Sequence, residues 1–405
     1  MTTDAELIDL IQSLAGPTFA ARQAAQHGIH QEPSYWEIAA PLREAMDAHP
    51  EFSGSPSAFF LGKQIGFFNQ HQSINILMIA SQVGAREALA WYRRVRETKR
   101  AQMRLVGELH GIAPPKATTL SNGVQLVPLA DLPTSPQTES LKASTRIGPA
   151  MYMPAGVVLD IGEVEASDDH DASHRRFLDY IQVVKRTVAA LTLHDNAAPT
   201  LGSVWLQFCD HNLQAAELGV MWMTSRQDGR HNDHPSSVDG AMLEWVERYL
   251  ALPACATEAI DFSISRLNLA RRRVTARDQA VDVCVAMESL LSGKGRGELT
   301  HRLAVRTALL LGTDLVARTA IVAEVRKLYD LRSKLVHGGD SPGFGDDPKE
   351  RTIAHRGLEL CLAALRAVVR SGQKPEPDEW ELTGGPPFNR YSETEPPRRA
   401  ESLPG

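Results

Sequence analysis

After Pro253 the chain is almost continuously helical in its periodicity, and this run constrains the fold more than any other feature. Apolar residues recur there at three- and four-residue intervals, which is the spacing of amphipathic helices. Glycine-rich stretches at 293–297 and 338–347 interrupt the pattern and indicate connections between helices. We therefore expect a bundle of four or five helices. The expected helices span 255–273, 277–291, 298–312, 316–337 and 350–371.

The preceding 252 residues divide into two regions of different character. Residues 1–110 are predicted to be mostly helical, with a long amphipathic stretch from Ala58 that stops at Gly111. Residues 111–252 are predicted to be an α+β region, because short alternating segments flank one helical stripe. The expected strands lie near 124–129, 156–164 and 203–208, and the expected helix spans 177–193.

The predicted fold class is therefore a multi-domain chain. An α-helical bundle over residues 253–372 follows the mostly helical N-terminal segment and the α+β region. Residues 373–405 are rich in Pro, Glu and Arg and poor in aliphatic side chains, so we expect a disordered tail that is dispensable for folding.

Composition excludes several classes of protein. No apolar run reaches the length of about 18 residues that a membrane span needs, so no membrane partner is expected. The first thirty residues lack a secretory signal pattern. The four cysteines are scattered, which predicts reduced thiols in a cytoplasmic protein.

A net charge of −6 argues against indiscriminate binding of nucleic acid. Basic residues nevertheless gather in two stretches, 93–104 and 266–277, and the second contains no acid. Each stretch can be a solvated helix face or a phosphate-binding surface. The basic residues of the second stretch are Arg266, Arg271, Arg272, Arg273 and Arg277.

The apolar stripe of the expected helix 316–337 contains one charged residue. At about 100° per residue, Arg332 falls near the centre of the apolar arc. A buried guanidinium without a partner is strongly unfavourable, so it needs an acid or a cleft. Glu288 lies on the apolar stripe of the expected helix 277–291, where an acid is equally out of place. We predict that Arg332 and Glu288 form an ion pair.

His337 ends the same predicted helix, before two glycines that suit a left-handed C-cap. The helix dipole at this end favours a protonated imidazole. Five residues separate His337 from Arg332, about 140° around an ideal helix. The two side chains can converge if the last turn unwinds, if the arginine curls round, or if two subunits share one cleft.

Arg332 and His337 form an Arg-x4-His motif within Tyr-Asp-x-Arg-Ser-x-x-Val-His-Gly, and this segment resembles the Apea-like branch of the HEPN superfamily. The resemblance continues upstream in the expected order and covers most of the predicted bundle. The other residues that carry the resemblance are Arg266-Leu267, Asp278, Met287-Glu288-Ser289-Leu290-Leu291, Gly297-Glu298 and Arg302.

The resemblance implies a helical bundle that commonly dimerises and, in many members, cleaves RNA without a metal or other cofactor. It makes Arg332 and His337 the catalytic pair, which would fit a prokaryotic toxin or an anti-phage effector. Active members often carry Asn, Asp or His where this chain has Ser333, the supporting position beside the arginine.

Two further roles complete the hypothesis. Glu288 would orient Arg332, and basic residues of the bundle would contact RNA phosphates without reading sequence. The residues expected at this RNA surface are Arg271, Arg272, Arg273 and Arg302. The alternative is a non-catalytic HEPN module for dimerisation or nucleotide binding. In either case residues 1–252 would sense an activating ligand or protein.

Two other polar segments are weaker candidates. Asp168 to Asp171 with His174 places two histidines beside carboxylates, which is compatible with a divalent ion but more typical of a solvated loop. His231 to Pro235 is typical of a polar turn.

Overall fold

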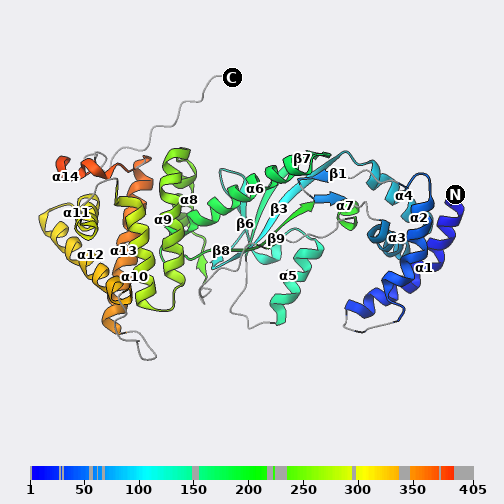
Figure 1. The fold of residues 1–405 in the computed structure, drawn as a ribbon, viewed down its shortest axis with the longest axis horizontal. Helices are drawn as coiled ribbons and strands as arrows, with labels where there is room; N and C mark the ends of the chain where they lie inside the picture. The colour runs from blue at the N-terminus through cyan, green and yellow to red at the C-terminus, as the bar shows by residue number, and fades with distance from the viewer. Residues whose placement is uncertain are drawn as a thin grey trace, which may run out of the picture.

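The computed structural model describes residues 2–26, 29, 32–53, 58–61, 63–65, 69–147, 155–216, 222–223, 235–293, 298–336, 347–373 and 375–386. The molecule is elongated and mostly helical, with an antiparallel sheet in its middle (Figure 1). The N-terminal helices lie at one end and the helices of residues 254–371 at the other. Among the described helices, none is long and apolar enough to cross a membrane.

The N-terminal end is built from α1 (Asp4–Gln26), α2 (Tyr35–Ala48), α3 (Asn69–Val83) and α4 (Ala85–Glu97). A short antiparallel hairpin of β1 (Ala58–Phe60) and β2 (Lys63–Ile65) lies between α2 and α3. Gly84 separates α3 from α4 at a φ of +93°, which glycine tolerates without strain. The buried core at this end includes Leu7, Ile11, Leu42, Met46, Phe52 and Tyr92.

The stretch from Ala58 to Gly111 is not the long helical segment that its amphipathic pattern predicts. Its last part, Arg100–His110, is strand β3 and belongs to the central sheet. Charged residues recur there at positions 100, 104 and 108. A four-residue spacing fits one face of a helix, but it also fits alternate positions on one face of a strand. The α+β region therefore begins about ten residues earlier than expected.

The sheet has the strand order β5-β6-β7-β3-β8-β9, and its pairings are antiparallel. Strand β3 pairs with β7 on one side and β8 on the other. The expected strands are confirmed with small shifts in their ends. The remaining bounds are β5 (Thr118–Thr119), β6 (Val124–Val127), β7 (Ala155–Glu165), β8 (Thr200–Phe208) and β9 (Trp222–Met223).

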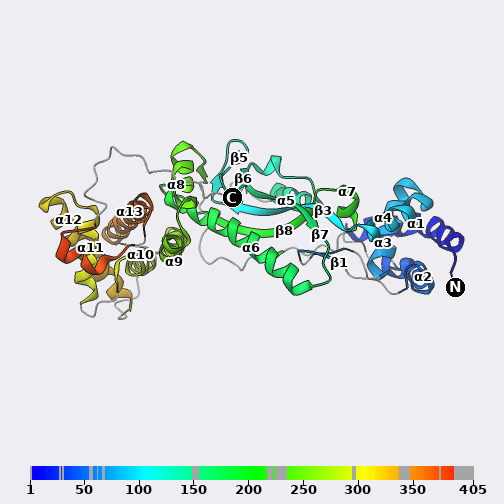
Figure 2. The same cartoon turned by 90° about the horizontal axis from the view of Figure 1, so that it is seen from above.

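Two helices cover opposite faces of this sheet (Figure 2). Helix α6 (His170–Ala190) packs its predicted apolar stripe, which includes Phe177 and Ile181, against one face. Helix α5 (Pro136–Ile147) lies on the other, where Leu141 meets a cluster around Trp205. The 3-10 turns η1 (Leu129–Asp131) and η2 (Leu191–Leu193), helix α7 (His211–Ala215) and the parallel pair β4 (Ile112–Ala113) and β10 (Ser236–Ser237) complete the region.

The C-terminal bundle matches the expected helices closely. After α8 (Gly240–Leu250) come α9 (Ala254–Arg272), α10 (Ala276–Leu291), α11 (Leu299–Leu311), α12 (Leu315–Val336) and α13 (Pro348–Ser371). The ends carry recognisable caps: the Thr275 side chain accepts from the backbone N–H of Asp278, and Gly372 ends α13 in the left-handed conformation. The bundle and the sheet region meet where α9 and α13 contact η2.

The predicted start of the disordered tail at residue 373 is wrong for residues 375–386. This segment forms η3 (Pro377–Glu379) and α14 (Trp380–Thr383), and Trp380 is 2% exposed. Asp378 and Glu381 lie 3.2 and 3.0 Å from the buried guanidinium of Arg306 on α11. A single aromatic side chain and two acids therefore attach a segment whose aliphatic content predicted no packing. Residues 387–405 lie outside the described residues.

Candidate functional site

The ion pair predicted between helices α12 and α10 is present. Arg332 Nη1 lies 3.0 Å from Glu288 Oε1. The arginine side chain is 31% exposed and the glutamate side chain 21% exposed. The pair therefore sits at the edge of the bundle rather than in its centre, and part of the arginine side chain is exposed.

Tyr329 joins this pair from one turn earlier on α12. Its hydroxyl donates to Glu288 Oε1 at 3.0 Å, the same oxygen that contacts Arg332. The guanidinium carbon of Arg332 lies 5.6 Å from the centre of the Tyr329 ring. Burial raises the pKa of Tyr329 above its ordinary value, so the phenol remains a hydrogen-bond donor at neutral pH. Sequence reasoning gave Tyr329 no role, although a three-residue spacing places it beside Arg332.

One nitrogen of this guanidinium is unused. Arg332 Nε is buried and finds no acceptor among the residues that the structure describes. A buried donor without an acceptor costs about 1–3 kcal/mol. Because Nε is itself buried, a ligand would meet the exposed part of the Arg332 side chain, which is 31% exposed, while Nη1 stays on Glu288. Phosphate and carboxylate oxygens match the planar donors of arginine.

The rest of the predicted catalytic motif is described only in part. Ser333 is exposed next to Arg332 on α12. His337 lies outside the described residues, so its relation to Arg332 remains a prediction. Glu350 on α13 contacts Arg277 Nε at 2.9 Å and Lys334 Nζ at 3.7 Å, which connects the last described turn of α12 to the start of α13.

The structure corrects the expected RNA-binding role of Arg271. Its Nη1 donates to the backbone carbonyls of Thr192, His194 and Ala197, at 2.6, 3.0 and 2.5 Å. Burial lowers the pKa of Arg271 to about 10. The guanidinium ties the bundle to the loop after α6, where clustered carbonyls replace water, and it is not available to a phosphate.

The neighbours of Arg271 are also engaged within the protein. Arg272 is 9% exposed and donates to Asn268 Oδ1 at 3.0 Å, which likewise corrects its expected role. Arg273 and Arg266 share the buried carboxylate of Asp282, at 2.6 and 3.1 Å. Arg302 is half-buried on α11, and its contact with RNA remains a prediction.

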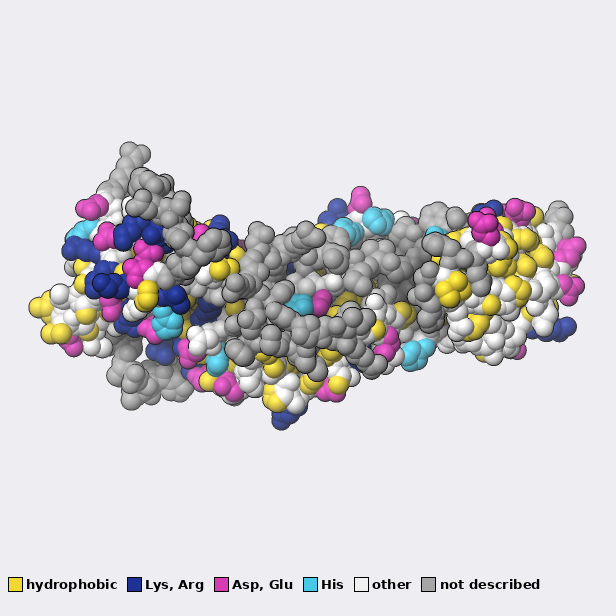
Figure 3. Space-filling model, turned by 90° about the horizontal axis from the view of Figure 1, so that it is seen from below, with side chains coloured by type: hydrophobic (Ala, Val, Ile, Leu, Met, Phe, Trp, Pro, Cys, Tyr) yellow, Lys and Arg dark blue, Asp and Glu magenta, His cyan; other side chains and the backbone are white. Residues whose placement is uncertain are grey.

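The surface charges agree with the finding that arginines of residues 266–277 contact other groups of the protein. On the face of the bundle that Figure 3 shows, Lys and Arg side chains are interleaved with Asp and Glu. Two arginines of the other basic stretch are also paired: Arg93 contacts Asp4 and Glu51, and Arg100 contacts Glu163.

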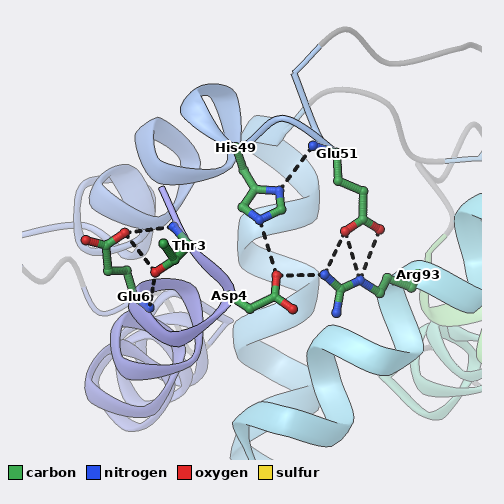
Figure 4. A network of polar contacts seen from close by, with 6 residues as sticks. All are labelled: Thr3, Asp4, Glu6, His49, Glu51 and Arg93. Atoms are coloured by element: carbon green, nitrogen blue, oxygen red, sulfur yellow. Dashed lines mark hydrogen bonds and ion pairs between the residues drawn. The ribbon is translucent and has the colours of Figure 1, made fainter. Parts of the chain in front are cut away.

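A second polar cluster lies among the N-terminal helices, at the opposite end of the molecule (Figure 4). Asp4, His49 and Glu51 are close enough together to hold a metal ion. Arg93 already supplies a cation there, at 2.8 Å from Asp4 and 2.6 Å from Glu51. His49 Nδ1 accepts the backbone N–H of Glu51, which leaves Nε2 to donate to Asp4 at 3.2 Å. We interpret this cluster as a set of structural contacts that joins helices α1 and α4 to the end of α2. Its residues are too far apart in the sequence to be recognised as a group.

Of the two weaker candidate segments, the structure describes only the first, Asp168 to His174. His170 begins α6 rather than lying in a loop, and Asp169 caps that helix by accepting from the N–H of Ala172. The rings of His170 and His174 stack with centroids 6.0 Å apart. Within the described residues they do not belong to a three-ligand group. His231 to His234 lie outside the described residues.

Comparisons with protein families, curated proteins and solved structures found no match. The arrangement around Arg332 is therefore the main observation from which a function can be inferred.

Proposed function

We propose that the protein is a metal-independent endoribonuclease of the HEPN type, which cleaves RNA in a site built around Arg332. The observation that carries the proposal is that two nitrogens of the Arg332 guanidinium differ in their contacts. Nη1 is held by Glu288 at 3.0 Å, and buried Nε has no acceptor among the described residues. The resemblance of the surrounding sequence to the Apea-like branch supports the same reading.

The chemistry needs few protein groups, because RNA carries its own nucleophile. The 2′-hydroxyl oxygen attacks the adjacent phosphorus, and the bond from phosphorus to the 5′-oxygen breaks. The products are a 2′,3′-cyclic phosphate and a 5′-hydroxyl. Arg332 would stabilise the negative charge that grows on the phosphate oxygens. His337 would move a proton, since its ordinary pKa lies close to neutrality.

We further propose that two copies of the chain complete the site. On a regular helix Arg332 and His337 point about 140° apart, so pairing of the segments 324–340 across a two-fold axis would bring them together. The described part of this segment exposes three cations and one acid, so two paired copies would need acids or RNA phosphates between them. The exposed charged residues are Arg326, Lys327, Asp330 and Lys334.

The test compares purified variants on RNA in the presence of EDTA. We expect the wild-type protein to leave cyclic phosphate ends, and Arg332→Ala and His337→Ala each to abolish cleavage while remaining folded. Arg248→Ala is the matched control, because Arg248 also pairs with a glutamate, Glu244, at 2.8 Å but lies on α8, outside the segment proposed to pair. It should cleave like the wild type. Mixing Arg332→Ala with His337→Ala should restore activity if the subunits share the site.

A wild-type protein that leaves RNA intact would contradict the proposal. Retained binding of RNA or nucleotide in that case would favour the non-catalytic HEPN module instead. Cleavage that survives Arg332→Ala would move the activity to another site.

A further inference from the structure

Two donors meet on one oxygen of Glu288, and they come from adjacent turns of α12. The Tyr329 hydroxyl and Arg332 Nη1 both lie 3.0 Å from Glu288 Oε1. Glu288 is on α10, so this single oxygen joins two helices of the bundle. The carboxylate is consequently oriented by the tyrosine as well as by the arginine.

The ring of the same tyrosine restrains the guanidinium from a second direction, because its centre is 5.6 Å from the guanidinium carbon. An arginine held through one nitrogen can still rotate about that contact, since its side chain has several free torsions. Contact with the aromatic ring removes much of this freedom and favours the cation electrostatically. The two contacts together fix the orientation of the guanidinium.

A tyrosine at this buried position also needs its hydroxyl bond. Tyr329 is 6% exposed, and a buried phenol is unfavourable without a partner. Phenylalanine would fill the same volume without that requirement. The hydroxyl therefore serves the orientation of Glu288 in addition to the packing of α12 on α10.

We propose that Tyr329 is a positioning residue, which acts through Glu288 to hold the Arg332 guanidinium in the orientation that meets the substrate phosphate. The inference rests on the proposed function for its catalytic consequence, but the orientation of Arg332 is a property of the resting protein. The two can therefore be tested separately.

The first experiment measures cleavage by Tyr329→Phe, which keeps the ring and removes only the hydroxyl. We expect kcat to fall about tenfold, because a misdirected guanidinium loses contact with the charge that develops in the transition state. KM should change little, because a contact that strengthens in the transition state affects kcat more than it affects ground-state binding. Tyr329→Leu removes the ring as well and should lower kcat further.

The second experiment is independent of activity. The Nε–H signal of Arg332 can be followed by NMR after isotope labelling of arginine, and it is assigned by its loss in Arg332→Lys. In the wild type we expect slow exchange of this proton with water. Tyr329→Phe should accelerate the exchange about tenfold, because the guanidinium gains freedom.

Tyr249 provides a matched control in the neighbouring helix α8. Its buried hydroxyl donates to the carboxylate of Asp261, so Tyr249→Phe removes a bond of the same chemical type. This variant should lose stability but keep the wild-type kcat and the wild-type exchange at Arg332. A purely structural role for Tyr329 predicts the same result for Tyr329→Phe, and that outcome would overturn the proposal.

Failure of the ribonuclease proposal and failure of the positioning role of Tyr329 give different results. If the wild type does not cleave RNA but Tyr329→Phe accelerates exchange at Arg332, the positioning role stands and the ribonuclease proposal fails. If exchange at Arg332 is unchanged in Tyr329→Phe, the positioning role fails whatever the activity.

Discussion

Arg93 and Arg332 lie at opposite ends of the molecule and have nearly the same exposure, 32% and 31% of their side chains. Their hydrogen bonds differ completely. Arg93 donates from Nε to both carboxylate oxygens of Glu51 at 3.0 Å, and from Nη2 to Glu51 and Asp4 at 2.6 and 2.8 Å. Arg332 contacts Glu288 through Nη1, and its Nε has no acceptor among the described residues.

The difference teaches that exposure alone does not identify a functional arginine. A guanidinium whose planar edge is filled by a carboxylate has no donors left in the geometry that recognises phosphate. Arg93 is such a case, and hydrogen bonding to Glu51 raises its pKa further. Arg332 has no acceptor at Nε among the described residues, so it is the arginine for which we propose a functional role, and we assign Arg93 a structural one.

The largest expected effect is on the unfolding free energy. It concerns Arg306, whose guanidinium is more deeply buried than that of Arg93. Arg306 is 3% exposed and bonds to Asp378, Glu381 and the end of α10. Truncation after Gln373 removes both acids and Trp380, and should lower the unfolding free energy by roughly 5 kcal/mol or more, as measured by urea denaturation. A chain ending at Pro386 should keep the wild-type stability. Equal stability of the two truncations would show that α14 contributes nothing.

The next largest effects are expected from replacing Arg332 and Arg93 with alanine, on kcat and on stability respectively. Arg332→Ala should lower kcat on RNA by about 100-fold or more, and its cost in stability should not exceed the roughly 1–2 kcal/mol of the contact with Glu288. Arg93→Ala should leave cleavage unchanged but lower the unfolding free energy by about 1–3 kcal/mol, because it leaves Asp4 and Glu51 facing each other. Steady-state kinetics and thermal denaturation of both variants measure the pattern. The reverse pattern would refute the comparison.

A double-mutant cycle tests whether the Arg332–Glu288 contact carries energy. Arg332→Met and Glu288→Met should show a coupling of about 1–2 kcal/mol in urea denaturation. This is less than a fully buried pair would give, because both side chains are partly exposed. Additive single effects would mean that the two charges do not interact in solution.

The smallest effect concerns pH at the N-terminal end. The hydrogen bond from Arg93 lowers the pKa of Asp4 below its ordinary value of 3.8. A depressed pKa means that the stabilisation is present above the unfolded-state pKa and is lost as pH falls through the folded-state value. Thermal stability should therefore decline below about pH 4. Arg93→Met should flatten this part of the profile, and an unchanged slope would contradict the assigned contact.

Local periodicity determined much of this protein. It predicted the five helices of residues 254–371, the strands around residues 124, 156 and 203, and the stripe of α6. It also predicted the Arg332–Glu288 pair, because each charge interrupts an apolar stripe. Helical spacing and turn residues act over a few positions along the chain, so the sequence carries them directly. The Apea-like resemblance of this region is likewise a sequence-level prediction.

Only the tertiary structure decided how the other charges are used. Whether Arg271 meets a phosphate or three carbonyls depends on a loop about 75 residues away, at Thr192 to Ala197. Whether residues 100–110 are a helix or a strand depends on β7 and β8, which supply the backbone partners. The docking of Trp380 and the contacts of Arg93 likewise join distant segments. Such contacts leave no periodic signal, because their partners are brought together only by folding.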